Sequence, residues 1–258
     1  MTLSLTPIVS GNDRGPTVVF IQGWPDDASL WDGAVAVLGD DYRCVRTTLP
    51  NFGGERATRW GHSTNEIVDA LEAFVEEAAR GGRVILVLHD WGSYWGHAVH
   101  HRRPDLVQAV VGIDVAPHFK PTLATTAMII AYQYWLFGAF VIGGPIGDAM
   151  TRGFGKLART PAPPSRLTSW MNYPYRNVWL DIFSGRIKAL VRGYWPTCPL
   201  LFVYGAKKPG AFHSAAWLEH VRKVGGEVVA IDCDHWVPRD AAFPPLLRRF
   251  LDARARGA

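Results

Sequence analysis

Six short apolar runs, each bounded by turn-forming residues, constrain the fold of this chain more than any other feature. They cover residues 17–22, 42–47, 84–88, 109–114, 200–204 and 228–231. Helical periodicity falls between or after these runs, at residues 64–79, 211–224 and 243–251. Strands that alternate with helices are typical of a parallel sheet, because parallel neighbours need long crossover connections. The sequence therefore predicts an α/β fold with a mostly parallel central sheet flanked by helices.

One long segment departs from this alternation. Residues 117–195 show no strand pattern, are rich in aromatic side chains and contain the proline-rich stretch 160–165. We expect this segment to be an inserted helical lid, or cap. The predicted organisation is a core made of residues 1–116 and 196–258, with the lid at residues 117–195.

Residues 127–142 of the predicted lid are apolar almost throughout, with Gln133 as the one interruption. At 16 residues, this run is shorter than the roughly 20 residues that a membrane-spanning helix needs. We therefore predict a lid helix that is buried on the core, and we expect no membrane association.

Composition narrows the class of protein further. The 27 Lys and Arg exceed the 23 Asp and Glu by only four and are scattered, so nucleic acid is not an expected partner. The three cysteines, Cys44, Cys198 and Cys233, form no CxxC pair, so neither a disulfide framework nor a metal site is predicted. The sequence has no phosphate-binding glycine motif and no secretory leader pattern, and we expect a cytoplasmic protein without a cofactor.

Asp90 is the first candidate for chemistry. It follows the apolar run 84–88 and precedes a helical pattern, in the sequence His89-Asp90-Trp91-Gly92-Ser93. A residue on such a strand-to-helix turn presents its side chain above the carboxyl edge of the sheet. The alternative is that Asp90 only caps the following helix, as aspartate often does.

Three further positions are predicted to meet Asp90 at that edge. Trp24 follows the first strong strand, so its backbone N–H can join that of Trp91 in an oxyanion hole. His235 follows the last strand, and Asp114 ends the strand at 109–113, from which it can orient the imidazole. Taken separately, His235 could be a surface histidine and Asp114 a turn-forming aspartate.

The order of these motifs resembles a known family. Gln22-Gly23-Trp24-Pro25, the His89-Asp90-Trp91-Gly92 turn, a lid insertion and a late histidine are similar to the epoxide hydrolase and haloalkane dehalogenase branch of the α/β-hydrolase fold. The resemblance extends from Val18 to Leu251. It implies that Asp90 is a nucleophile, His235 a base and Asp114 the acid that supports it. Some members carry the acid after a later strand, but residues 205–210 contain no carboxylate here.

The lid adds a second resemblance. Tyr132-Gln133-Tyr134 and Tyr175-Arg176-Asn177 are similar to the segments that bear the two epoxide-activating tyrosines of epoxide hydrolases. Carried over by position, Tyr132 and Tyr175 form the pair, with Tyr134 or Tyr173 as alternatives. Simple packing of the lid tyrosines is the competing interpretation.

These residues imply a function. An aspartate nucleophile suits displacement at a saturated carbon. We predict an epoxide hydrolase that forms an ester on Asp90 and releases a vicinal diol, with a small apolar or aromatic substrate and water as its partners. Tyr134, Trp135, Tyr173 and Trp179 are expected in the substrate pocket. One alternative is a haloalkane dehalogenase, in which the Trp91 indole and a second tryptophan or asparagine hold the halide, with Trp24 or a lid tryptophan as candidates for the second donor. Another is a non-catalytic binding protein for apolar ligands, and a homo-oligomer is left open.

Three features depart from the family pattern. Gln22 stands where the family usually has histidine, and Leu88 stands where a small residue is usual. Only about 15 residues precede the first strong strand, so we expect one short strand there instead of a hairpin.

Overall fold

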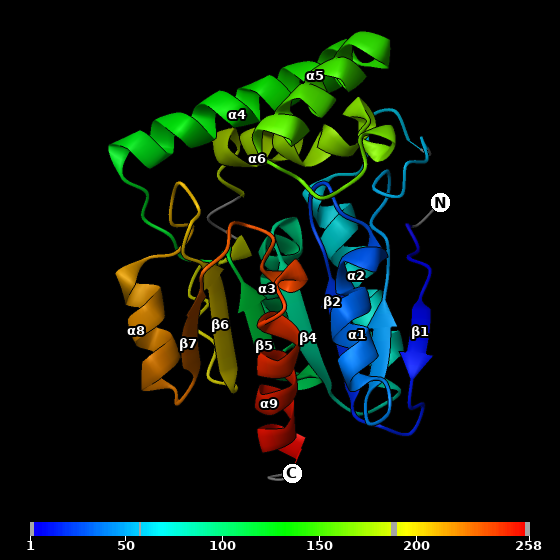
Figure 1. Cartoon of the computed structure of the whole chain (residues 1–258), viewed down its shortest axis with the longest axis vertical. Helices are drawn as coiled ribbons and strands as arrows, with labels where there is room; N and C mark the ends of the chain where they lie inside the picture. The colour runs from blue at the N-terminus through cyan, green and yellow to red at the C-terminus, as the bar shows by residue number, and fades with distance from the viewer. Residues whose placement is uncertain (1–2, 57, 187–189, 256–258) are drawn as a thin grey trace.

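A seven-stranded sheet is the centre of the computed structural model, which describes residues 3–56, 58–186 and 190–255 (Figure 1). The strand order is β1-β3-β2-β4-β5-β6-β7, and only β1 runs antiparallel to its neighbour. This agrees with the predicted α/β fold. The strands are β1 (Ile8–Gly11), β2 (Thr17–Ile21), β3 (Arg43–Arg46), β4 (Val84–His89), β5 (Val107–Ile113), β6 (Leu200–Gly205) and β7 (Glu227–Ile231).

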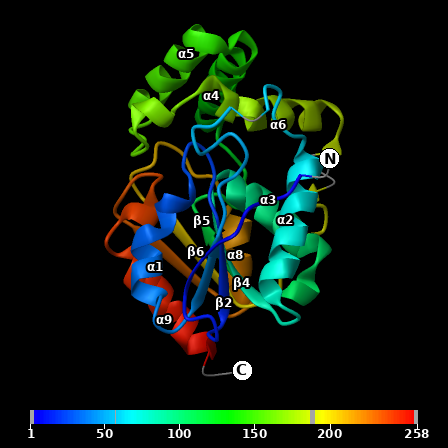
Figure 2. The ribbon, with the colours of Figure 1, turned by 90° about the vertical axis from the view of Figure 1, so that its right-hand side faces the viewer.

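Helices cover both faces of the sheet (Figure 2). One face packs against α1 and α9, and the other packs against α2, α3 and α8. The bounds of the core helices are α1 (Asp32–Leu38), α2 (Thr64–Ala79), α3 (Trp91–Arg102), α8 (Ala215–Lys223) and α9 (Phe243–Ala255). A capping box between Ser63 and Glu66 starts α2 at Thr64, where the predicted helical periodicity begins.

Strand β4 positions the candidate site. All six of its residues are buried, and it lies between β2 and β5, with Leu88 paired to Ile21 and to Gly112. A continuous apolar run of this kind is typical of a central parallel strand that is covered on both faces. The residue that follows β4 therefore leaves the sheet at the middle of its carboxyl edge.

The segment between β5 and β6 contains α4 (Leu123–Ile142), α5 (Gly144–Leu157) and α6 (Tyr173–Phe183). No strand lies in the described residues of this segment, and its helices lie above the carboxyl edge of the sheet (Figure 1). We call residues 117–195 the lid segment. That this segment forms a lid separate from the core stays a prediction.

One expectation about α4 was wrong. The helix lies in the lid segment as predicted, but only 22% of its most apolar stretch is buried, so it is not a buried helix. Among the described residues it is one helix that is long and apolar enough to cross a membrane, judged by length and composition. Because α4 is apolar on every side, its sequence carried no signal for which face would point outward.

The expectation for the N-terminus is confirmed. One short strand, β1, precedes β2 and closes the edge of the sheet by pairing with β3.

Candidate active site

Asp90 lies on a strained turn between β4 and α3. Its backbone has φ 53° and ψ −122°, a conformation that a residue with a side chain rarely adopts. Its side chain makes no capping hydrogen bond to an N–H beyond the first residue of α3, so the capping interpretation has no support. The strain is instead the geometry expected where a turn holds a reactive side chain above a sheet.

Two backbone N–H groups hold one side of the Asp90 carboxylate. The N–H of Trp24 donates to Oδ1 at 2.7 Å, and the backbone N–H of Trp91 also bonds to this carboxylate. A Cβ on Gly23 would lie 2.3 Å from both Asp90 Oδ1 and the Trp91 nitrogen, so only glycine fits there. The two donors predicted for an oxyanion hole therefore both lie against the Asp90 carboxylate.

The other side of the carboxylate faces His235. The Nε2 atom of His235 lies 3.4 Å from Asp90 Oδ2, and its Nδ1 atom bonds to Oδ2 of Asp114. Asp114 is fully buried, and its Oδ1 accepts a hydrogen bond from the Gly205 N–H at 3.1 Å. The structure thus brings Asp90, His235 and Asp114 into one chain of contacts, although they lie far apart in the sequence.

Charge interactions in this chain outweigh the effect of burial. Burial alone would lower the pKa of His235, but the carboxylates of Asp114 and Asp90 raise it to about 9. Burial would raise the pKa values of both carboxyl groups, yet contact with His235 holds both below the usual value. The resting site therefore contains an imidazolium between two carboxylates.

His89, directly before Asp90, supports this arrangement. Its Nε2 lies 2.9 Å from the backbone oxygen of His235, and burial together with the nearby imidazolium lowers the pKa of His89 to about 4. A neutral His89 that donates through Nε2 fixes the loop that bears His235. Sequence reasoning had assigned no role to His89.

Lys208 is a second group that sequence reasoning missed. It follows β6, and its buried ammonium lies 2.6 Å from Asp114 Oδ2, the oxygen atom that His235 also contacts. It also bonds to the backbone oxygen of Asp114 at 3.2 Å. Residues 205–210 were noted only for lacking a carboxylate, whereas the structure shows that they supply a cation to the carboxylate of Asp114.

We expect Lys208→Met to raise the pKa of His235. Without the ammonium, the whole charge of Asp114 acts on the imidazolium, so a step that needs neutral His235 should reach its half-maximal rate at higher pH. The rate at pH 7 should fall by roughly tenfold. The pH profile of ester hydrolysis measures the shift, and Lys207→Met, at the neighbouring exposed lysine that pairs with Asp232, is the control. An unshifted profile would contradict this role.

Two tyrosines of the lid segment, Tyr132 on α4 and Tyr175 on α6, lie close enough to Asp90 to feel its charge. The ring of Tyr175 lies 5.3 Å from that of Trp91 and 6.0 Å from those of Trp24 and Tyr132. Burial is the main cause that raises the pKa of both tyrosines, and the charge of Asp90 adds to it. Both hydroxyl groups are therefore protonated and available as donors across the pH range of most enzymes.

Two predicted pocket residues do not fit the structure. Tyr134 and Trp135 lie on the outer face of α4, each about half exposed (46% and 50%). Tyr134 stacks on Trp179 at 4.6 Å, and the Trp135 indole donates to the Met150 backbone oxygen at 3.1 Å. The sequence pattern could not distinguish the faces of a helix that is apolar all round. It therefore could not show that these two side chains point outward, away from the predicted pocket.

Tyr173, the alternative to Tyr175, is buried elsewhere. Its ring packs edge-on against Phe52 at 5.9 Å, and its hydroxyl has no hydrogen-bond partner among the described residues. It sits beside Gly61, where even a Cβ would collide with its ring. Tyr173 therefore packs against the loop before α2.

The departures at Gln22 and Leu88 have different consequences. A Cβ on Gly96 would lie 2.4 Å from a terminal carbon of Leu88, so the glycine on α3 makes room for the larger side chain. Gln22 is fully buried, and neither polar atom of its side chain has a partner among the described residues. An unpartnered buried amide costs stability.

The tryptophan indoles near Asp90 are already engaged. The Trp24 Nε1 donates to Asn172 Oδ1 at 2.8 Å, and the Trp91 side chain forms a hydrogen bond with Tyr175. Asn172 in turn donates to Thr151 Oγ1 at 2.7 Å, which ties the loop of Trp24 to the lid segment.

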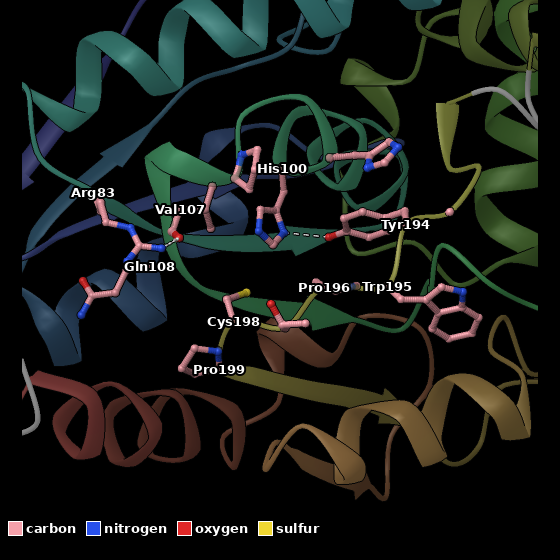
Figure 3. Close-up of a pocket in the computed structure, with 13 residues that line it drawn as sticks. Arg83, His100, Val107, Gln108, Tyr194, Trp195, Pro196, Cys198 and Pro199 are labelled. Atoms are coloured by element: carbon pink, nitrogen blue, oxygen red, sulfur yellow. Dashed lines mark hydrogen bonds between the residues drawn. The ribbon is translucent and has the colours of Figure 1, made fainter.

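A separate cavity of about 540 Å³ lies at the amino ends of the central strands (Figure 3). It is lined by residues at the amino ends of β4, β5 and β6, among them Arg83, Val107 and Pro199, and by Tyr194. The Asp90 group sits at the carboxyl ends of the same strands. This cavity is therefore not part of the candidate site.

Comparison with protein families supports the resemblance noted from the motifs. A family model described as the alpha/beta hydrolase fold matches residues 16–241. A haloalkane dehalogenase from Bradyrhizobium elkani has a similar structure, with a TM-score of 0.73 and 15% sequence identity, and the match covers 100% of this chain and 98% of that one. At this identity, the likeness concerns the fold alone.

Curated relatives match over shorter stretches. A protein named probable oxidoreductase EphD, from Mycobacterium tuberculosis, is 35% identical over 96 residues, which is 36% of this chain and 16% of that protein. Epoxide hydrolase 3 from Xenopus tropicalis is 30% identical over 116 residues, which is 43% of this chain and 30% of that protein. The matches thus span less than a third of the length of these two relatives.

Proposed function

Because this chain belongs to the alpha/beta hydrolase fold family, we propose that it acts as a hydrolase and, specifically, as an epoxide hydrolase that converts an apolar or aromatic epoxide into a vicinal diol. The observation that carries the proposal is the pair of protonated tyrosines, Tyr132 and Tyr175, near an ionised aspartate that faces the His235 ring. The relative named epoxide hydrolase 3 supports the same class of reaction.

The first step is an alkylation. Oδ1 of Asp90 accepts the hydrogen bond from the Trp24 N–H, so we assign the attack on a ring carbon of the epoxide to Oδ2. The ring carbon–oxygen bond breaks, and a hydroxyl of Tyr132 or Tyr175 gives its proton to the ring oxygen as negative charge develops there. The product is an ester between Asp90 and the opened substrate.

The second step is hydrolysis of that ester. Ester formation removes the charge of Asp90, so one of the two carboxylates that raise the pKa of His235 is lost and the imidazolium releases its proton to solvent. His235 takes a proton back from solvent when the Asp90 carboxylate is restored at the end of the cycle. Neutral His235 takes a proton from water, which attacks the carboxyl carbon of Asp90. The N–H groups of Trp24 and Trp91 then hold the oxyanion at Oδ1, where each contributes roughly 3 kcal/mol.

The collapse of this intermediate releases the diol. The bond between the carboxyl carbon and Oδ2 breaks, and His235 returns its proton to the departing oxygen. The second proton of the water restores the tyrosine hydroxyl, so one epoxide and one water give one diol without a cofactor.

A haloalkane dehalogenase is a weaker candidate. Such an enzyme would need free N–H donors to hold the departing halide, whereas the indoles of Trp24 and Trp91 bond to Asn172 and Tyr175. A non-catalytic protein would have no need for the strained turn at Asp90. The substrate, the oligomeric state and the cytoplasmic location stay predictions.

We expect Tyr132→Phe and Tyr175→Phe each to lower the rate of alkylation by about 100-fold, because each removes one hydrogen-bond donor to the developing alkoxide. Rapid-quench measurement of ester formation with styrene oxide is the test. The matched control is Tyr173→Phe, which removes a hydroxyl that has no partner among the described residues and should leave the rate unchanged.

Equal rates for all three variants would remove the basis for an epoxide substrate. Release of bromide from a bromoalkane at a rate that Tyr132→Phe and Tyr175→Phe do not change would favour the dehalogenase.

A further inference from the structure

The outer face of α4 is an exposed stripe without a single charge. The whole helix contains no Asp, Glu, Lys or Arg, and Leu123 at its start is 88% exposed. The exposed face of a helix on a globular protein is ordinarily polar. We call the following residues the α4 stripe: Leu123, Ala124, Ala127, Ile130, Ala131, Tyr134, Trp135, Val141 and Ile142.

Neighbouring helices extend this apolar surface. Tyr134 of the stripe stacks on Trp179 of α6, and Trp179 contacts Phe183, which is 76% exposed. At the other end of α4, Ile146 on α5 is also exposed. Exposed apolar surface that spans several elements usually marks an interaction site.

Positive charge is concentrated in the same part of the chain. The lid segment carries nine Lys and Arg against two Asp, whereas the other 179 residues carry 18 Lys and Arg against 21 Asp and Glu. Both aspartates of the lid segment, Asp148 and Asp181, are buried and paired with arginines. The exposed cations include Lys120 before α4 and Lys156 on α5. The lid segment is therefore cationic at its surface, on a core with the opposite net charge.

We propose that the α4 stripe docks this protein reversibly onto a membrane surface that contains anionic lipids. Apolar and aromatic side chains on one face, flanked by cations, are the composition of helices that lie in the plane of a lipid interface. Exposed Tyr and Trp side chains, such as those of Tyr134 and Trp135, are suited to the headgroup region. Lysines and arginines around the stripe would then meet lipid phosphates and serine headgroups.

The rest of the fold decides between lying on the membrane and crossing it. The inner side of α4, with Ile129, Leu136 and Phe140, is buried in the protein, and the helix packs along α5 and α6. If α4 crossed a bilayer, its packing contacts with α5 and α6 would be lost. The outer stripe can enter the interface with the fold unchanged.

A second copy of this chain is the competing occupant of the stripe. In a symmetric dimer the same surface of both copies meets, which would bring two cationic lid segments together. An anionic lipid surface satisfies the apolar stripe and the charge at once. The sequence predicts no membrane association because it predicts a buried lid helix, and the exposure of α4 removes that reason.

Vesicle co-sedimentation of the full chain tests the proposal. We expect binding to vesicles of phosphatidylcholine with about 30% phosphatidylserine, weaker binding to phosphatidylcholine alone, and a loss of affinity at high salt. Ile130→Glu should weaken binding by about tenfold or more, because it places a carboxylate in the interface. Val37→Glu on α1 is the matched control, since the exposed fractions of Val37 and Ile130 are 42% and 41%.

Leu123→Glu offers a second variant in case Ile130→Glu perturbs the fold, which thermal unfolding monitors. No binding of the wild-type chain to anionic vesicles would overturn the proposal, and so would equal binding of the Ile130→Glu, Leu123→Glu and Val37→Glu variants. A dimer that dissociates on Ile130→Glu, without vesicle binding, would assign the stripe to a second copy. None of these readouts depends on epoxide hydrolysis, so the docking and the proposed function can fail separately.

Discussion

Asp90→Asn is expected to lower kcat/KM for epoxide hydrolysis by about 10⁴-fold or more, to the limit of detection. The amide is a poor nucleophile, so the ester cannot form, although the site keeps its shape. Steady-state diol production measures the loss. Thermal unfolding checks that the variant stays folded, because the replacement also removes the ion pair between the carboxylate and His235.

A surface replacement of the same chemistry provides the control. Asp105→Asn exchanges an exposed aspartate that pairs with Arg103, and it should leave the rate unchanged. Diol formation by Asp90→Asn at more than a hundredth of the wild-type rate would show that another group attacks the substrate, and the proposed mechanism would then be wrong.

His235→Gln is expected to stop turnover while leaving the first step intact. Alkylation uses the carboxylate of Asp90, but without an imidazole no group activates the water, so the rate of ester hydrolysis should fall by about 10⁴-fold. The ester should then accumulate in one equivalent per chain. Intact-protein mass spectrometry after incubation with styrene oxide, followed by peptide mapping to Asp90, makes the measurement.

The added mass separates the two candidate reactions. An epoxide adds its whole mass to Asp90, because no atom leaves. A haloalkane adds only its alkyl group, because the halide leaves, so the mass increase is smaller than the mass of the substrate. The double variant of His235→Gln with Asp90→Asn should gain no mass, and an adduct on it would identify another nucleophile. A single variant that forms no adduct with any epoxide or haloalkane would favour a binding protein.

The strands were predictable because each local pattern is strong. The run at 84–88 is apolar throughout and became β4, Val84–His89, and the helix predicted at residues 64–79 begins and ends at those residues. Such patterns indicate whether one face or both faces of an element are buried. They can be read within a short stretch of sequence, because the residues of one face recur every two to four positions. The predicted helix at 211–224 is shorter in the structure, Ala215–Lys223, because Ser214 caps its start.

The candidate site was predictable in part. Asp90, Asp114 and His235 each follow a strand, and parallel strands bring their carboxyl ends to one edge, so their proximity followed from the topology. Lys208 also follows a strand, but no motif announced it. Its role depends on a contact with Asp114, which lies 94 positions away in the sequence. The bond between Trp24 and Asn172 joins residues 148 positions apart, and no motif announced it either.

The amino acids alone determined the order of strands and helices, the carboxylate on the turn after the fourth strand and the imidazole after the last. Only the tertiary structure decided that a lysine shares the oxygen atom of Asp114 with His235, and that the uncharged helix α4 turns one side outward. The physical reason is the range of the interactions. Periodicity and turn chemistry act between residues close in sequence, whereas the partner of a buried charge and the exposed side of an all-apolar helix are set by packing between distant segments.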